Sequence, residues 1–341
     1  MDLDTLHKGR QTIVFDRHPV ILAHSAIAGK KESEGPLAGF FDHTETDTRF
    51  GQKTWEKAET RLQELALDTA RSKAQLQYSD LDVLFAGDLL NQCISSAFAI
   101  RDTRIPFLGL YGACSTMAES LTLAAAAVNA GYAVRAAALT SSHFATAERQ
   151  YRFPLGYGGQ RTPTAQWTVT GSGCCIVGGS GSGVRIEAAT IGRVQDFGIK
   201  DANNMGAAMA PAAIDTLQAH FRDLRRVPQD YDLIVTGDLG ALGKKIVLDQ
   251  FQRVGVDLTP VYDDCGVLIY DPKRQDVHAG GSGCGCGASV LCGYLLDRLE
   301  KRELRRLLFC ATGALLSPTS SWQGESIPGI CHAVAITAEG R

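Results

Sequence analysis

The sequence predicts an α/β protein made of two similar halves, and three observations lead to this fold class. Residues 81–89, Leu-Asp-Val-Leu-Phe-Ala-Gly-Asp-Leu, closely match residues 231–239, Tyr-Asp-Leu-Ile-Val-Thr-Gly-Asp-Leu. In each half a turn of small residues, at Cys114 and at Cys284-Gly-Cys286, opens a helix rich in alanine or leucine. Each helix leads into a further apolar strand, at 134–140 and 307–312. Because helix and strand alternate twice in the same order, we expect two mixed sheets covered by helices.

Length and composition fit two halves with a core each. The chain has 341 residues, of which 45% are hydrophobic, and a formal charge of −3. This length suffices for two core-bearing units, which we place at residues 1–190 and 191–341. The weak net charge and the lack of a basic run give no indication of nucleic-acid binding. No signal peptide is predicted, and Asn129 and Arg135 interrupt the most apolar segment, so no membrane span is predicted either.

The ten cysteines indicate free thiols rather than disulfides or a metal site. Without a secretion signal, a cysteine-containing chain is expected in a reducing compartment. The close pairs Cys174-Cys175 and Cys284-Gly-Cys286 lack the two-residue gap of a structural zinc site. No metal and no cofactor is therefore predicted.

In the first half, strands are predicted at 11–15 and 19–22, before an exposed excursion at 30–52. Thr54 is a candidate N-cap for a helix over 55–77, whose apolar residues follow helical spacing. The pattern then predicts a buried strand over 82–87, a short helix over 93–100 and a buried strand over 105–110. A helix from Met117 to Gly131 and the strand over 134–140 follow.

Residues 144–172 interrupt this alternation, because neither a helical nor a strand period fits them. We interpret them as a long functional loop or small cap inserted in the first half; a solvent-facing insertion is the alternative. A binding surface is favoured because arginines and aromatic residues gather here: Arg149, Tyr151, Arg152, Phe153, Tyr157, Arg161 and Trp167.

Beyond the insertion, strands are predicted at 174–179, 184–193 and 232–237, and helices at 207–226 and 242–254. A short strand at 267–270 precedes the Gly-rich turn at 280–287, which opens a helix to about residue 301. Strands at 307–311 and 330–337 close the chain.

Cys114 lies where a predicted strand gives way to a helix. A helix N-terminus offers unpaired N–H groups and partial positive charge, which favour a thiolate or a bound anion. This is the geometry of a cysteine nucleophile; the alternative is a small apolar cysteine packed under a helix. A pocket between the two halves, at the helix N-termini, is the default ligand site.

Several longer strings resemble the thiolase superfamily and, within it, the stage V sporulation protein AD (SpoVAD) family. They are Leu-Tyr-Gly-Ala-Cys-Ser-Thr at 110–116, Thr-Ser-Ser-His-Phe-Ala-Thr-Ala-Glu-Arg-Gln at 140–150, Pro-Thr-Ala-Gln-Trp-Thr-Val-Thr-Gly at 163–171 and Ala-Gly-Gly-Ser-Gly-Cys-Gly-Cys at 279–286. The resemblance implies a five-layered αβαβα fold, usually dimeric. It also implies binding of dipicolinic acid during its uptake into the developing bacterial spore, beside membrane proteins of the same operon. The chain would then be intracellular, in the forespore or spore, and peripheral to the spore inner membrane through those partners.

The sequence departs from the enzymes of that superfamily at the positions that assist the cysteine. Cys114 matches their nucleophile, but their second-half Asn or His falls around Asp238, and their Gly-His-Pro or Asn motif falls within 280–284. His278 lies too far upstream to substitute. A thiolate without its base and oxyanion donors loses several orders of magnitude in rate. We therefore expect a non-enzymatic binding protein, with an acyl-transfer or condensing enzyme using Cys114 as the alternative.

Dipicolinate is a flat aromatic dianion, and such a ligand favours cationic side chains, backbone N–H groups at a helix N-terminus and an aromatic wall. Calcium is expected only as part of a calcium–dipicolinate ligand. A homodimer is expected through the apolar strand at 106–110. The predicted ligand-binding residues are Cys114, Ser115, Ser142, His143, Arg149, Arg152, Trp167, Asp238 and Cys284.

Overall fold

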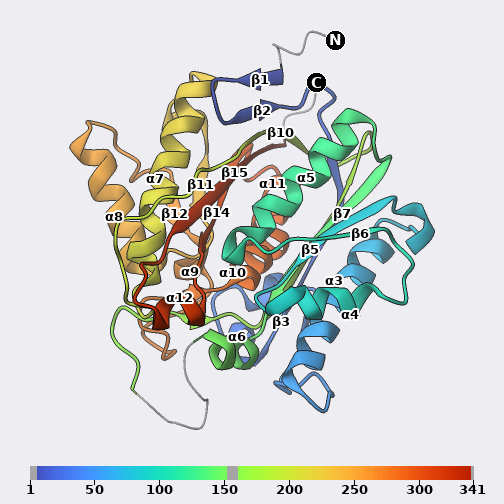
Figure 1. The fold of residues 1–341 in the computed structure, drawn as a ribbon. Helices are drawn as coiled ribbons and strands as arrows, with labels where there is room; N and C mark the ends of the chain where they lie inside the picture. The colour runs from blue at the N-terminus through green and yellow to red at the C-terminus, as the bar shows by residue number, and fades with distance from the viewer. Residues whose placement is uncertain (1–5, 152–159, 339–341) are drawn as a thin grey trace.

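The computed structural model describes residues 6–151 and 160–338 and shows a mixed sheet between helices (Figure 1). The strands are β1 His7–Lys8, β2 Thr12–Val14, β3 Val20–Ala28, β4 His43–Thr44, β5 Val83–Gly87, β6 Phe107–Gly109, β7 Arg135–Ser142, β8 Trp167–Thr168, β9 Gly171–Gly178, β10 Val184–Thr190, β11 Leu233–Thr236, β12 Tyr262–Asp264, β13 Gly281–Ser282, β14 Arg306–Ala314 and β15 Gly329–Thr337. The helices are α2 Lys30–Ser33, α3 Trp55–Lys73, α4 Ile94–Ile100, α5 Thr116–Ala130, α6 Phe144–Tyr151, α7 Met205–Leu224, α8 Gly240–Arg253, α9 Cys265–Leu268, α10 Cys284–Ser289, α11 Leu296–Glu300 and α12 Pro318–Trp322.

The strand order confirms the predicted duplication, because the same sequence of parallel and antiparallel pairs runs inward from both ends of the sheet. The order is β12-β11-β14-β15-β10-β3-β9-β7-β5-β6. In each half two parallel pairs are followed by two antiparallel ones, and the halves join where β10 pairs with β3. The matching aspartates also act alike: Asp82 accepts the N–H groups of residues 134 and 135, and Asp232 those of residues 305 and 306. The boundary between residues 190 and 191 stays a prediction. Strand β10, which ends at residue 190, pairs with β15 of the second half over more residues than with β3 of the first.

Helices lie in three layers around the two halves of the sheet, which gives the five-layered α/β fold that the sequence predicts (Figure 1). Helices α3 and α4 cover the outer face of the first half-sheet, and α7 and α8 that of the second. Helices α5, α10 and α11 lie between the half-sheets, and a π-helix, Val290–Leu295, joins α10 to α11. Each interface is filled by its own cluster of buried apolar side chains, and the middle cluster is the largest.

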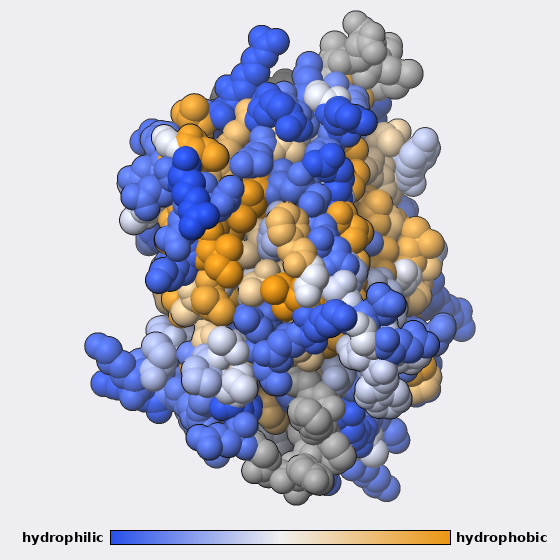
Figure 2. Space-filling model, turned by 60° about the vertical axis from the view of Figure 1, so that its left-hand side comes forward, coloured by the Kyte–Doolittle hydropathy of each residue, from blue (hydrophilic) through white to orange (hydrophobic). Residues whose placement is uncertain are grey.

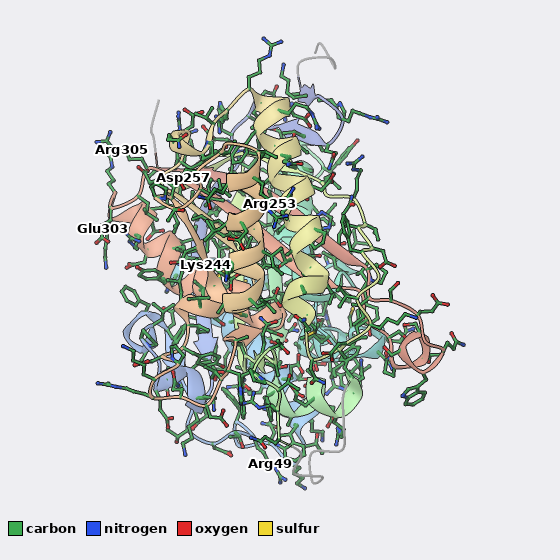
Figure 3. The ribbon with its side chains drawn as sticks, turned by 90° about the vertical axis from the view of Figure 1, so that its left-hand side faces the viewer. Arg49, Lys244, Arg253, Asp257, Glu303 and Arg305 are labelled. Atoms are coloured by element: carbon green, nitrogen blue, oxygen red, sulfur yellow. The ribbon has the colours of Figure 1, made fainter. Side chains whose placement is uncertain are left out.

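Helices α7 and α8 run side by side over the second half-sheet (Figure 3). Lys244 of α8 pairs with Asp263 of β12 at 2.7 Å. In Figure 2 the upper part of this side of the molecule carries patches of hydrophobic residues, whereas hydrophilic ones prevail lower down. Among the described residues, no helix is both long and apolar enough to cross a membrane.

Four predicted elements differ in the structure. The prediction of a strand at 267–270 is wrong, because Val267 lies in helix α9. The strand in this region is β12, which ends directly before that helix. The strand expected at 19–22 continues through His24 and Ser25 to residue 28. These polar residues are tolerated in a buried strand because each is hydrogen-bonded: the Ser25 hydroxyl donates to the carbonyl of Ala66 at 2.6 Å, and His24 Nδ1 lies 2.5 Å from the carbonyl of Cys292.

The strand expected to be buried at 105–110 is the short edge strand β6, in which Leu108 is 56% exposed. The expected loop at 144–172 begins as helix α6, which buries Ala145 and Ala147, and contains the short strand β8. An apolar run in the sequence indicates that one face of the strand is buried, but it does not distinguish a central strand from an edge strand. Residues 152–159 of this segment, with the predicted ligand residue Arg152, lie outside the described residues.

A candidate ligand cavity at Cys114

Cys114 lies in a single turn of 3-10 helix, Ala113–Ser115, directly before α5 in the middle layer. Ala113 takes a left-handed conformation with φ of 52°, which turns the chain sharply into the helix. Strand β14 of the second half packs closely against this turn. A Cβ atom added at Gly313 would lie only 2.9 Å from the carbonyl oxygen of Gly112. The position of Cys114 at the start of a middle-layer helix is thus as the sequence predicts.

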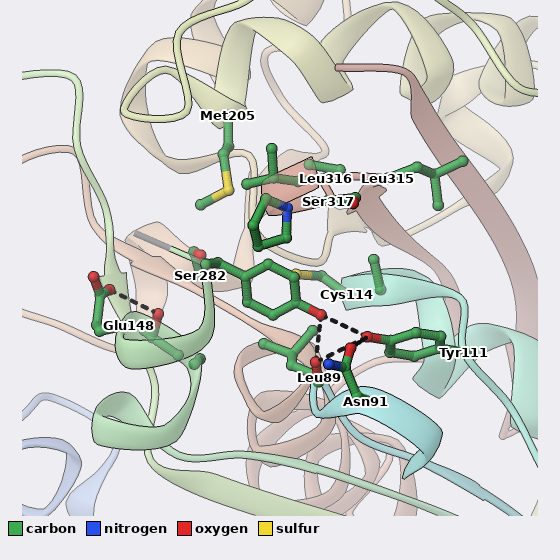
Figure 4. A pocket seen from close by; sticks show the side chains of 16 residues that line it. Leu89, Asn91, Tyr111, Cys114, Glu148, Met205, Ser282, Leu315, Leu316 and Ser317 are labelled. Carbon is green, nitrogen blue, oxygen red and sulfur yellow. Dashed lines mark hydrogen bonds between the residues drawn. The ribbon is translucent and has the colours of Figure 1, made fainter. Parts of the chain in front are cut away.

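A cavity of about 310 Å³ opens over Cys114, between the two halves of the chain (Figure 4). Its walls come from α6, from the segment after β5, and from the segment between β14 and α12. Apolar side chains make up most of the walls, and no histidine is among the described residues that line them. The lining residues are Leu89, Asn91, Tyr111, Ala113, Cys114, Ala147, Glu148, Tyr151, Thr168, Met205, Ser282, Ala314, Leu315, Leu316, Ser317 and Pro318.

Hydrogen bonds between tyrosines tie one wall of the cavity together (Figure 4). The Tyr111 hydroxyl lies 2.9 Å from the Tyr151 hydroxyl and 3.1 Å from the amide oxygen of Asn91, and its single proton can be donated to either. The Tyr151 hydroxyl also donates to the carbonyl of Leu89. Helix α6 is thereby attached to the segment after β5.

The Cys114 thiol is held protonated by its surroundings. It is 8% exposed and donates a hydrogen bond to the buried carboxylate of Asp238 from the other half. That carboxylate also accepts the Thr312 hydroxyl at 2.7 Å and the N–H of Gly283 at 2.9 Å. Burial raises the pKa of Asp238 to about 6. Burial and then Asp238 raise the pKa of Cys114 well above its ordinary value, although the N–H of Gly283 acts in the opposite direction.

Three other predicted residues are buried beneath the cavity and do not line it. The Ser115 hydroxyl donates to the carbonyl of Gly112 at 2.6 Å, within the Cys114 turn. The Ser142 hydroxyl accepts the N–H of Gly285 at 2.9 Å, and the Cys284 thiol donates to the carbonyl of Ala113 at 3.2 Å. The Cys284 bond fixes the start of α10 against the start of α5, and the Ser142 bond fixes it against β7. Their contribution is to position Cys114.

The remaining described predictions point away from the cavity. His143 Nε2 donates to the carbonyl of Thr48 at 2.8 Å, and burial lowers the pKa of His143 to about 4, so this side chain is neutral. Arg149 pairs with Glu56 on α3. Trp167 faces away from the cavity, because successive side chains of β8 face opposite ways and Thr168 takes the side toward the cavity. The Trp167 ring is stacked on that of Phe144. The cationic and aromatic wall expected from His143, Arg149 and Trp167 is therefore not formed by them.

Sequence reasoning missed most of the lining. Tyr111 stands three residues before Cys114, and Leu89 ends the repeated Gly-Asp-Leu motif, so both could have been found from motifs already recognised. Met205 and residues 314–318 carry no motif, and only the tertiary fold brings them to Cys114.

A chain of buried polar side chains runs behind the cavity. The Ser141 hydroxyl donates to Glu59 of α3 at 3.0 Å, and Gln63 donates to Ser141 at 2.8 Å and to Ser96 at 2.9 Å. Ser96 donates in turn to Asp88 at 2.6 Å. Burial, and then the charge of Asp88, raise the pKa of Glu59 to about 8. Glu59 therefore keeps its proton at neutral pH.

A duplicated five-layered fold, with a cysteine at the start of a middle-layer helix and a cavity between the halves, defines a thiolase-like protein. The chain belongs to the family described as Stage V sporulation protein AD (SpoVAD), whose model matches residues 9–337. Stage V sporulation protein AD of Bacillus subtilis (strain 168) is 48% identical over 333 residues, which are 97% of this chain and 98% of that one.

Solved structures show the same fold at low sequence identity. An OleA variant from Xanthomonas campestris is 14% identical, with a TM-score of 0.61, over 95% of this chain and 97% of that one. Human mitochondrial 3-ketoacyl-CoA thiolase, in complex with CoA, is 13% identical, with a TM-score of 0.58, over 96% and 99%. 3-oxoacyl-[acyl-carrier-protein] synthase III from Aquifex aeolicus VF5 is 11% identical, with a TM-score of 0.57, over 94% and 99%.

Proposed function

We propose that this chain is a non-enzymatic protein that binds dipicolinic acid in the Cys114 cavity and serves its uptake into the developing spore. The observation that carries the proposal is the state of Cys114. A buried thiol that donates to the carboxylate of Asp238 is a poor nucleophile, because only the thiolate attacks an acyl group. The described lining supplies no histidine to remove its proton.

The cavity suits one small aromatic acid. Leu89, Met205 and Leu316 offer apolar surface to a flat ring, and the hydroxyls of Tyr111 and Ser317 offer hydrogen bonds. Helix α5 begins beside Cys114, and the partial positive charge of its N-terminus favours a carboxylate.

Calorimetric titration with dipicolinate, with and without calcium, tests the proposal. We expect saturable binding of one molecule per chain, and weaker binding of isophthalate, which has both carboxylates but no ring nitrogen. A titration without saturable heat in either condition would contradict the proposal. A larger affinity with calcium would identify the calcium chelate as the preferred ligand, since no group of three metal-binding side chains occurs among the residues described.

The alternative is an acyl-transfer enzyme, and the position of Cys114 at a helix start on the cavity floor favours it. Turnover of an acyl-thioester that is lost in Cys114→Ala would establish this alternative and overturn the non-enzymatic proposal.

The carboxylate of Asp238 is expected to control the reactivity of Cys114. Removing its charge in Asp238→Asn lowers the pKa of the thiol, so alkylation of Cys114 by iodoacetamide at neutral pH should accelerate at least about tenfold. The alkylated peptide is followed by mass spectrometry, because all ten cysteines are free. The exposed Asp249→Asn is the matched control. Equal rates in the wild type and Asp238→Asn would show that Asp238 does not hold the thiol proton.

A homodimer through β6 is part of this proposal. The strand ends the sheet order, and exposed apolar side chains lie on and near it: Phe98, Leu108, Tyr111 and Leu123. A second copy adding its own β6 would continue the sheet and cover them. We expect sedimentation to give a dimer, and Leu108→Lys to shift it toward the monomer. A wild-type chain that stays monomeric at high concentration would contradict this.

We further propose that the protein acts in the forespore or spore, at the inner membrane, through membrane proteins of the same sporulation operon. Its membership of a sporulation family supports the compartment. Co-purification of such membrane proteins with the tagged chain from sporulating cells tests the association, and their absence from the purified material would count against it.

A further inference from the structure

Two cations lie over one aromatic ring on the outer side of β8. The Nζ atom of Lys31 is 3.7 Å from the ring centroid of Trp167, and the Cζ atom of Arg161 is 4.6 Å from it. Phe144 is stacked on Trp167 with centroids 3.9 Å apart and planes inclined by 7°. Because Phe144 fills one face of the indole, both cations lie over the other.

These two positive charges are only partly neutralised by the residues around them. Among the described residues, Lys31 forms no ion pair, and the buried Nη1 atom of Arg161 has no hydrogen-bond acceptor. The Nη2 atom of Arg161 pairs with the carboxylate of Asp276 at 3.2 Å and donates to the backbone carbonyl of Asp276 at 2.9 Å. The same carboxylate also pairs with His278. Burial, and next the charge of Arg161, lower the pKa of Lys31, and the opposing charges of Asp276, Glu32 and Glu34 do not offset them.

The nearest buried carboxyl group compensates this pair only in part. Glu32 adjoins Lys31 in sequence, but it is 1% exposed and accepts hydrogen bonds from the Tyr270 hydroxyl and the N–H of Thr170 at 3.1 Å. Burial raises the pKa of Glu32 to about 7, so at neutral pH it carries only part of a charge. Two like charges held close together in a partly buried place repel each other, and a bound anion removes that repulsion.

We propose that Lys31 and Arg161, with Trp167 between them, form a binding site for a small oxyanion, a phosphate or a carboxylate. The ammonium group and the free Nη1–H group are both suited to charge-assisted hydrogen bonds to the oxygens of such an ion. The site is separate from the Cys114 cavity, since Thr168 and not Trp167 faces that cavity. It does not depend on the proposed function.

Fluorescence of a chain that keeps only Trp167 tests this site. Trp55→Phe and Trp322→Phe leave that single tryptophan, and inorganic phosphate is titrated against sodium chloride at constant ionic strength. We expect a saturable change with phosphate alone. A chain that keeps only Trp55 is the control: Arg49 and Arg149 lie near that ring, but Arg149 already pairs with Glu56. Broadening of the phosphate phosphorus resonance by the unmodified chain is a readout free of substitutions.

Substitutions assign the site. Lys31→Met and Arg161→Gln should each weaken phosphate binding at least about tenfold, whereas Lys30→Met, at the exposed neighbouring lysine, should leave it unchanged. A second arm repeats the titration with acetate and dipicolinate to separate phosphate from carboxylate ligands. The proposal is overturned if no probe saturates, if chloride gives the same response, or if Lys30→Met and Lys31→Met weaken binding equally.

Discussion

Cys114→Phe is expected to abolish dipicolinate binding, with a loss of affinity of at least about a hundredfold. The thiol lies on the floor of a cavity of about 310 Å³, and a benzyl side chain at this position would occupy the space where the ligand ring belongs. Cys114→Ala removes only a small group from a turn, and the N–H groups at the start of α5 remain. We expect that variant to bind within about threefold of the wild type, at about 1 kcal/mol lower stability.

Calorimetric titration of both variants and the wild type makes the comparison, with circular dichroism to confirm that each is folded. Arg149→Gln is a useful control, because its guanidinium pairs with Glu56 outside the cavity, and we expect its affinity to change less than about twofold. If the folded Cys114→Phe binds dipicolinate as tightly as the wild type, the ligand site is elsewhere.

The second large effect is a fall in stability as the pH rises, with Glu59 as the main cause. The pKa of Glu59 is raised from 4.5 to about 8 in the folded chain, so between these values the folded state holds a proton that the unfolded chain releases. The free energy of unfolding therefore decreases as the pH rises through this range. Raised pKa values of Glu32 and Asp264, both about 7, act in the same direction. The buried histidines His143, His220 and His332, with pKa values lowered to about 4, 3 and 4, act in the opposite direction below about pH 6.5. We therefore expect a loss of at least about 2 kcal/mol between about pH 6.5 and pH 8.

Thermal and urea unfolding at a series of pH values measure this dependence. Glu59→Gln does not titrate, and its amide can accept the hydroxyl of Ser141 and donate to that of Thr146, which can itself donate to the carbonyl of His143. The stability of this variant should therefore vary less with pH. Glu64→Gln, on the same helix at the surface, should retain the full dependence. An identical pH profile for Glu59→Gln and the wild type would exclude Glu59 as the cause.

How much the sequence reveals differs between fold and site. The repeated Gly-Asp-Leu motifs predict the duplication because each closes a strand in the same way, and the strand order confirms it. The small residues around Cys114 predict its place at a helix start for the same local reason. The state of the site depends on remote contacts: Thr48 and burial make His143 neutral, and Asp238 holds the proton on Cys114. No local periodicity reports such contacts.

Contacts between the two halves at the cavity floor determine when the cavity can form during synthesis of the chain. Cys114 depends on Asp238, which is itself held by Thr312, and Cys284 donates to Ala113. The second half thus completes the cysteine turn of the first. On the ribosome, the first half emerges with its cysteine turn unsupported, and the floor is complete only after β14 has been made. We therefore expect a truncation before residue 306 to remove the proposed ligand site as a whole, although every residue from Cys114 to Trp167 is still present.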